Sequence, residues 1–122
     1  MTGSSKRGPL DPLAPERATV RTALFGGERA VRVWDLGART PPFTAVLHCE
    51  LEPGGRVGEH VQETDDEVVI VVSGEATIYV DGVAHGSVPG TAVALALGSR
   101  LAIDNASPDA PVRYLIVKAR GR

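Results

Sequence analysis

The sequence has 122 residues, of which 43% are hydrophobic and 23% charged, and its formal net charge is −2 at pH 7. This length suits one domain with a single core, and the small net charge excludes an overall field that would attract nucleic acid or an anionic membrane surface. No apolar run approaches the roughly 20 residues of a membrane span, no signal peptide is expected, and the single Cys49 excludes an internal disulfide and fits a reducing cytoplasm.

Residues 1–16 are rich in Gly, Ser and Pro, and prolines recur at positions 9, 12 and 15. Proline has no backbone N–H and disrupts a helix interior. We therefore predict a flexible or extended N-terminal arm over residues 1–16 and a single domain over residues 17–122.

From Ala18 onward, short runs of Val, Ile, Thr and Leu are separated by Gly, Pro and Asp, which is typical of an all-β sandwich or barrel. Asp81-Gly82 predicts a two-residue hairpin turn, since glycine accepts the positive φ that a type I′ turn needs. The predicted strands cover residues 19–25, 29–36, 43–51, 56–61, 67–73, 75–81, 83–88, 92–97, 100–104 and 111–119.

The run from Glu67 to Val72 is apolar on both faces apart from its first residue. Strand alternation places Glu67, Val69 and Val71 on one face and the three intervening residues on the other. Two apolar faces both need cover, from another part of the chain or from a partner. We expect a homodimer that covers the outer face.

Three polar residues follow the spacing Gly54-x5-His60-x-Gln62-x4-Glu67-x6-Gly74. His60 and Gln62 are two residues apart on one predicted strand, so their side chains share a face. A short acidic connection then returns the chain, and a hairpin brings Glu67 beside His60. An imidazole, a carboxamide and a carboxylate are therefore expected to converge.

This pattern resembles the first motif of the cupin superfamily, G-x5-H-x-H-x3–4-E-x6-G, except that Gln62 replaces the second histidine. The second cupin motif, G-x5-P-x-G-x2-H-x3-N, is traceable with Ala96 for its proline and Leu101 for its histidine. The resemblance covers about residues 43–119. It implies an all-β fold, a double-stranded β-helix or jelly-roll barrel of two antiparallel sheets. The second pattern reads Gly90-x5-Ala96-x-Gly98-x2-Leu101-x3-Asn105.

The resemblance assigns metal-ligand positions to His60 and Glu67, while Gln62 matches a ligand position with a weaker, neutral oxygen. Leu101 cannot ligate a metal. Divalent metal sites generally use three or four protein donors. Two interpretations stay open: a buried His60–Glu67 pair without metal, or a weakly held Fe, Mn, Ni, Cu or Zn ion completed by water.

Cys49 shares a face of its strand with Leu47 and Leu51, the more apolar face, so it is predicted to point into the barrel. There it is either a small buried apolar residue or a thiolate that replaces a missing imidazole. His48 has the opposite parity and is predicted at the surface or at an interface.

Three functions follow from these residues. In the first, a small organic molecule occupies a cavity with walls that include Leu101 and Val69. His60 and Glu67 then transfer protons in an isomerisation, cyclisation or similar reaction, and Gln62 holds the molecule. The second is a metal-dependent oxygenase or isomerase that uses His60, Gln62 and Glu67. The third is a non-catalytic dimeric module that senses a ligand.

Overall fold

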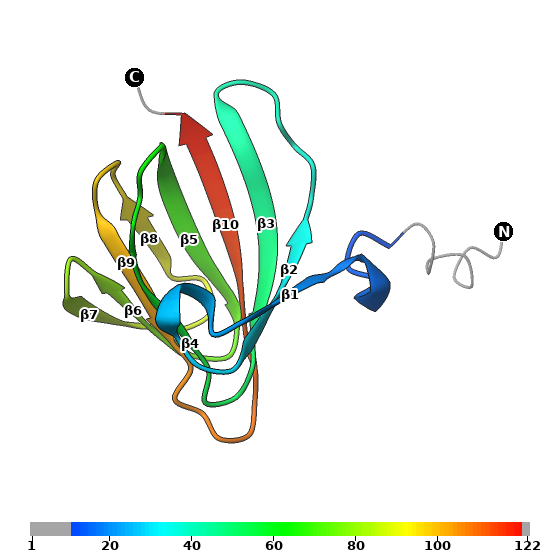
Figure 1. Cartoon of the computed structure of the whole chain (residues 1–122), viewed down its shortest axis with the longest axis vertical. Helices are drawn as coiled ribbons and strands as arrows, with labels where there is room; N and C mark the ends of the chain where they lie inside the picture. The colour runs from blue at the N-terminus through cyan, green and yellow to red at the C-terminus, as the bar shows by residue number, and fades with distance from the viewer. Residues whose placement is uncertain (1–10, 121–122) are drawn as a thin grey trace, which may run out of the picture.

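Residues 11–120 are described by a computed structural model, in which two antiparallel sheets face each other (Figure 1). The larger sheet has the strand order β1-β2-β3-β10-β5-β8, and the smaller sheet has the order β4-β9-β6-β7. The predicted all-β fold of two antiparallel sheets is confirmed. The strands are β1 (Thr19–Thr22), β2 (Ala30–Asp35), β3 (Phe43–Leu51), β4 (Arg56–Val61), β5 (Asp65–Ser73), β6 (Ala76–Val80), β7 (Val83–Ser87), β8 (Ala92–Leu95), β9 (Arg100–Asp104) and β10 (Val112–Arg120).

In residues 11–120, the helical elements are two short 3-10 turns, η2 (Pro15–Arg17) and η3 (Leu24–Gly26). The predicted first strand ends earlier than expected, because the chain turns into η3 with positive φ at Ala23 and Phe25. The predicted Asp81-Gly82 hairpin is confirmed, with φ of 50° and 81° at its two residues. Within residues 11–120, no helix has the length and apolar character needed to cross a membrane.

The core lies between the sheets and is built from alternate residues of the facing strands. On β5, Val69 and Val71 are fully buried, whereas Val68 and Ile70 are half-buried on the other face and Val72 is 45% exposed. Each fully buried Val, Leu or Ile stabilises the fold by about 1.5–3 kcal/mol relative to an exposed side chain. The largest buried apolar side chains are Leu51, Ile78, Leu95, Leu101, Ile103, Val69, Val71 and Val112.

Residues 11–17, here called the N-terminal segment, cover part of the outer face of the larger sheet. Trp34 and His48 are paired across β2 and β3, and their rings make an edge contact with centroids 5.5 Å apart. The indole Nε1 of Trp34 donates to the carbonyl of Ala14 at 2.9 Å, and Ala14 is itself buried. His48 lies on the face opposite to Cys49, as its parity predicts, but it is buried at 6% exposure, so the surface alternative of the prediction is wrong. Residues 1–10 of the predicted arm lie outside the described residues.

The turns that flank the second half of the barrel depend on residues retained from the two motifs. Asn105 is buried, and its Nδ2 lies 2.9–3.2 Å from the carbonyl oxygens of Leu51, Glu52 and Ala110. Its Oδ1 accepts from the backbone of Ser107. This one side chain therefore ties the end of β3 to the loop between β9 and β10. The motif glycines with positive φ are Gly54 (72°), Gly74 (78°), Gly90 (94°) and Gly98 (91°).

Candidate functional site

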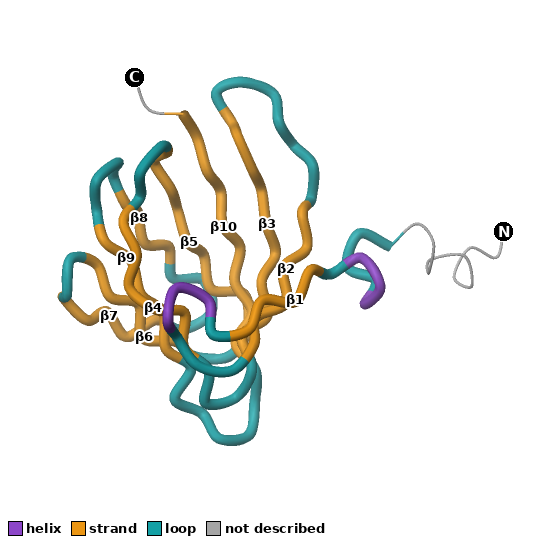
Figure 2. The backbone as a smooth tube through the Cα atoms, in the orientation of Figure 1, coloured by secondary structure: helices purple, strands orange, loops and turns teal. Residues whose placement is uncertain are grey.

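A cavity of about 300 Å³ opens between the two sheets. Its wall is formed by residues of β2, β3, β4, β5, β9 and β10, and the η3 turn contributes Leu24 and Phe25. The η3 turn lies against β4 (Figure 2). His60, Gln62, Glu67, Leu101 and Cys49 all line it. The structure thus brings together five of the six residues singled out in the sequence.

Val69 is the exception. It is fully buried in the core and is not among the described residues that line the cavity. Glu67 precedes it by two residues on the same face of β5, so Glu67 occupies the cavity end of that face and Val69 lies deeper.

Glu67 is 4% exposed and faces Lys118, its register partner on β10. Lys118 Nζ lies 3.8 Å from Glu67 Oε1, and Glu67 Oε2 is buried with no hydrogen-bond partner. Burial raises the pKa of Glu67 to about 7, although the charge of Lys118 acts in the opposite direction. Near neutral pH, Glu67 is therefore a carboxyl group that can give or take a proton.

Gln62 lies just beyond β4, where its backbone is fixed by two hydrogen bonds. Its N–H donates to Ser99 and its carbonyl accepts from Gly98, both at 2.8 Å. The side chain is 4% exposed, and its Nε2 has no partner. A buried, unpaired amide costs about 1–3 kcal/mol, which a ligand with an oxygen acceptor would offset.

His60 is half-buried and its ring orientation is fixed from two sides. Nδ1 lies 2.9 Å from the carbonyl oxygen of Gly58, which can only accept, so Nδ1 carries the hydrogen. In the neutral imidazole, Nε2 then holds the lone pair. The ring stacks on Phe25 with centroids 3.8 Å apart and an interplanar angle of 14°. Burial lowers the pKa of His60, so the neutral, basic form is favoured.

The backbone around η3 approaches β4 very closely. A Cβ added to Gly27 would lie 1.8 Å from the carbonyl oxygen of Arg56, and one added to Gly58 would lie 1.9 Å from that of Phe25. Phe25 itself has a φ of 54°, an uncommon value for an aromatic residue. This tight contact places Phe25 over His60 at the cavity wall.

Cys49 and Tyr114 are register partners on β3 and β10, and both are buried in the cavity wall. Burial is the main cause that raises the pKa of Cys49 to about 12, and it also raises that of Tyr114. The thiol is therefore neutral at physiological pH. It contributes as a small apolar residue, one of the two roles expected from the sequence.

Sequence reasoning missed Lys118 and Phe25. Lys118 has the same strand parity as Tyr114 and Ile116, so once Tyr114 is placed in the wall, alternation along β10 carries Lys118 into the cavity. For Phe25 there is no comparable signal, because its position depends on the positive φ values of the η3 turn.

The residues present do not fit a bound divalent metal. Within residues 11–120, no group of three or more His, Cys, Asp or Glu side chains is arranged to hold a metal ion. Leu101 fills one position that the resemblance gives to a ligand, and the thiol of Cys49 is held neutral. In addition, the Lys118 ammonium group is directed at Glu67 and would repel a cation there.

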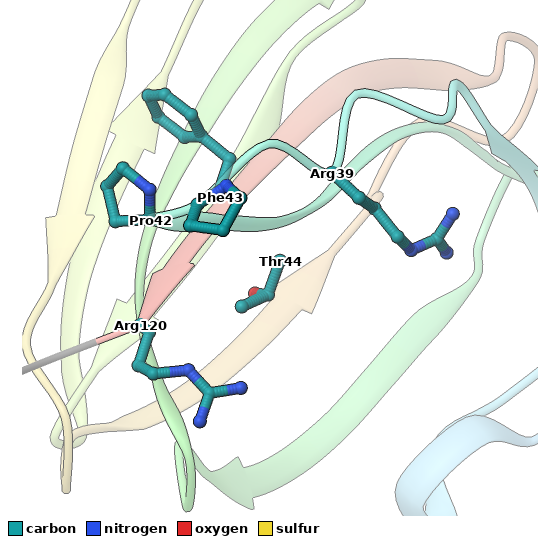
Figure 3. Close-up of a pocket in the computed structure, with 6 residues that line it drawn as sticks. Arg39, Pro42, Phe43, Thr44 and Arg120 are labelled. Atoms are coloured by element: carbon teal, nitrogen blue, oxygen red, sulfur yellow. The ribbon is translucent and has the colours of Figure 1, made fainter.

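A second, larger hollow of about 700 Å³ lies where β3 begins and β10 ends (Figure 3). Arg39, Phe43 and Arg120 at its edge are exposed, and Arg39 is paired with Asp35. No carboxylate or imidazole lines it among the described residues. The chemistry is therefore concentrated in the smaller cavity.

A sequence model of the family described as Cupin domain matches residues 47–118. No curated protein gives a significant match. Among solved structures, a predicted oxalate decarboxylase from Thermotoga maritima superposes with a TM-score of 0.79 at 20% identity, and the match covers 85% of this chain and 92% of that one. At this identity the likeness shows the fold alone.

Two other structures are more similar in sequence. A sugar phosphate isomerase from Silicibacter pomeroyi is 28% identical with a TM-score of 0.63, over 75% of this chain and 60% of that one. The Cupin_2 domain of an XRE family transcriptional regulator from Enterobacter cloacae is 26% identical with a TM-score of 0.66, over 75% of this chain and 98% of that one.

Proposed function

The chain belongs to the cupin domain family, and from this premise we propose that its cavity binds a small organic molecule and catalyses a proton transfer within it. The observation that carries the proposal is that a base and an acid, His60 and Glu67, line the same cavity. His60 presents the lone pair of Nε2, and Glu67 holds a proton up to about pH 7.

The reaction best suited to this pair is an enolisation or a related isomerisation. His60 Nε2 removes a proton from a carbon next to a carbonyl group, while Glu67 gives its proton to the carbonyl oxygen. The double bond moves from C=O to C=C. When the first carbon carries a hydroxyl group, Glu67 takes the hydroxyl proton while His60 returns its proton to the former carbonyl carbon, so the carbonyl group moves by one carbon and both side chains recover their starting protonation. Without that hydroxyl group the proton returns to the first carbon, and the reaction is hydrogen exchange. Because both groups begin neutral, no isolated charge has to enter the apolar cavity before the reaction starts.

The remaining polar groups have supporting roles. Gln62 Nε2 is a free donor for an oxygen of the bound molecule, and Lys118 stabilises negative charge that develops beside Glu67. Leu101 and Ile103 supply apolar walls that exclude water from the reacting atoms.

Carbon–hydrogen exchange in D₂O tests this proposal directly. Small enolisable ketones and oxo acids are incubated with the protein, and loss of the ¹H NMR signal beside the carbonyl is measured. We expect exchange above the buffer rate, and a decrease of about 100-fold in His60→Gln or Glu67→Gln. His85→Gln, on the exposed strand β7, is the matched control. Exchange that is unaffected by either cavity substitution contradicts the proposal.

A second candidate function is ligand sensing without catalysis. It is favoured by the similarity to the cupin domain of a transcriptional regulator, since the match covers 98% of that chain. In this case, small molecules bind and raise the unfolding temperature, but no carbon–hydrogen exchange occurs with any of them.

We also propose that two copies associate through the outer face of β5. The half-buried Val68 and Ile70 and the exposed Val72 support this, because together they form an apolar row on the side away from the core. Light scattering is the test: the expected mass is that of a dimer, and Ile70→Lys should shift it to that of a monomer.

A further inference from the structure

The cavity carries one feature that proton transfer alone does not require, which is a lysine beside the buried acid. Within residues 11–120, Lys118 is the only lysine or arginine that lines the cavity. Its Nζ is 3.8 Å from Glu67 Oε1, beyond the range of a good hydrogen bond, and its side chain keeps 34% exposure. The ammonium group therefore has donors available for a bound molecule.

Two buried atoms in the same cavity also lack a partner. Gln62 Nε2 and Glu67 Oε2 both belong to side chains of residues that are 4% exposed. Gln62 offers N–H donors, so the atom that it meets must be an acceptor. Unpaired polar atoms buried in a cavity point to a ligand that completes their hydrogen bonds.

From these contacts we propose that the ligand is a small monocarboxylate with a second oxygen acceptor, such as a short 2-oxo acid. Lys118 holds its carboxylate and Gln62 donates to its other oxygen. The inference rests on the proposed function, because it assumes that this cavity is the binding site.

The charges in the cavity explain why one negative charge fits and two do not. Lys118 is a single cation and already has the Glu67 carboxyl group beside it. A phosphate ester brings close to two negative charges and would leave one of them uncompensated in a largely apolar space. Glu63 at the edge is an additional acidic group, but it is exposed and therefore strongly screened.

Phe25 and His60 favour a flat ligand. Their stacked rings form one wall of the cavity, and its volume of about 300 Å³ accommodates only a small molecule. A planar 2-oxo acid satisfies both conditions and also has the enolisable carbon that proton transfer needs.

The test compares 2-oxobutanoate with its neutral counterpart 2-oxobutanamide and with glycerol 3-phosphate, each titrated into the full chain by calorimetry. We expect 2-oxobutanoate to bind about tenfold more tightly than the amide, and glycerol 3-phosphate to bind more weakly than both. Lys118→Met should abolish the preference for the acid, whereas Lys118→Arg should retain it. Arg113→Met is the control on the same strand, since Arg113 pairs with Glu50 and lies outside the cavity lining.

Equal binding of acid and amide overturns the inference, as do tighter binding of glycerol 3-phosphate, an unchanged preference in Lys118→Met, or no binding of 2-oxobutanoate at millimolar concentration. Thermal unfolding of each variant checks that it is folded, and recovery in Lys118→Arg separates loss of charge from loss of structure. Binding of the acid without carbon–hydrogen exchange would leave this inference standing and refute the proposed catalysis. Carbon–hydrogen exchange in neutral ketones, without tighter binding of 2-oxobutanoate than of its amide, would support the proposed catalysis and refute this inference.

Discussion

The two motif segments use their polar residues in opposite ways. The first covers Gly54–Gly74 and the second covers Gly90–Asn105, and both consist of strands and tight turns. In the first, Gln62 and Glu67 are buried in the wall of a cavity, and one polar atom of each has no partner. In the second, Asn105 is equally buried, but both polar atoms of its amide are hydrogen-bonded to backbone.

The difference separates two requirements that a barrel of this kind must meet. Asn105 and the turn glycines hold the strands in place, whereas Glu67 and Gln62 leave buried polar atoms unsatisfied and so lower stability. Leu101 replaces a potential ligand with an apolar side chain without affecting the turns around it. The fold is therefore retained while the chemistry of its cavity changes.

The strongest way to break this comparison is to replace Asn105. In Asn105→Ala the carbonyl oxygens of Leu51, Glu52 and Ala110 lose their shared donor, so we expect the free energy of unfolding to fall by about 4 kcal/mol. Urea denaturation measures it. A loss below about 1 kcal/mol would mean that water replaces the side chain at no significant cost.

Glu67 should lower the stability of the folded protein, whereas Asn105 raises it, and the size of the Glu67 effect depends on pH. The folded protein holds the Glu67 proton up to about pH 7, whereas the reference carboxyl releases it at 4.5. This contribution to stability is therefore complete below pH 4.5 and is lost as the pH rises through about 7, a change of about 3 kcal/mol.

Glu67→Gln removes this pH dependence. The free energy of unfolding of the variant, relative to wild type, should rise by about 3 kcal/mol between pH 4.5 and values above 7. The lowered pKa of His60 acts in the other direction below pH 6.5, but it is common to both proteins and cancels in the difference. A difference that does not change with pH would show that folding does not raise the pKa of Glu67.

Gly74 tests the turns with a matched control. Gly74 and Gly82 have similar φ values of 78° and 81°, but a Cβ at Gly74 would lie 2.6 Å from the carbonyl oxygen of Pro111, and one at Gly82 would meet nothing within 4 Å. We expect a loss of about 2 kcal/mol in Gly74→Ala and about 1 kcal/mol in Gly82→Ala. Equal losses, measured by thermal unfolding, would mean that strand β10 shifts to accommodate the added methyl group.

The smallest expected effect concerns the affinity of the cavity for divalent metal ions. Wild type should bind divalent ions weakly, and Leu101→His should increase affinity for Zn²⁺ about tenfold, because it adds an imidazole opposite His60 in the register of β4 and β9. Elemental analysis after equilibration with Zn²⁺ gives the occupancy. Near-stoichiometric metal in wild type that disappears in His60→Ala would contradict the donor set described above.

Much of the fold followed from local patterns. Strands 43–51, 56–61 and 100–104 were predicted with the bounds that the structure shows, because Gly, Pro and Asp mark their ends. The turn at Asp81-Gly82 was predicted for the same reason. Local chemistry sets these features, so the sequence contains the information directly.

The candidate site was only partly predictable. Spacing and parity placed His60, Gln62 and Glu67 in one cavity, but the predicted hairpin is wrong, because β4 and β5 lie in different sheets and face each other across the cavity. Lys118 is 51 positions from Glu67 in sequence and meets it only through the register of β10 against β5. The burial of His48 was missed because it requires the chain near Ala14 to fold over the sheet. Register and long-range cover are tertiary effects, which single-strand patterns do not specify.

Because Trp34 is hydrogen-bonded to Ala14, its fluorescence should report whether the N-terminal segment is docked on the sheet. Trp34 is the only tryptophan in the sequence, and its indole lies beneath the N-terminal segment on the outer face, away from the cavity. Release of that segment would expose the indole to water and shift its emission to longer wavelength. A ligand in the cavity should leave the emission almost unchanged, so docking of the segment and occupancy of the barrel can be followed as separate signals in one sample.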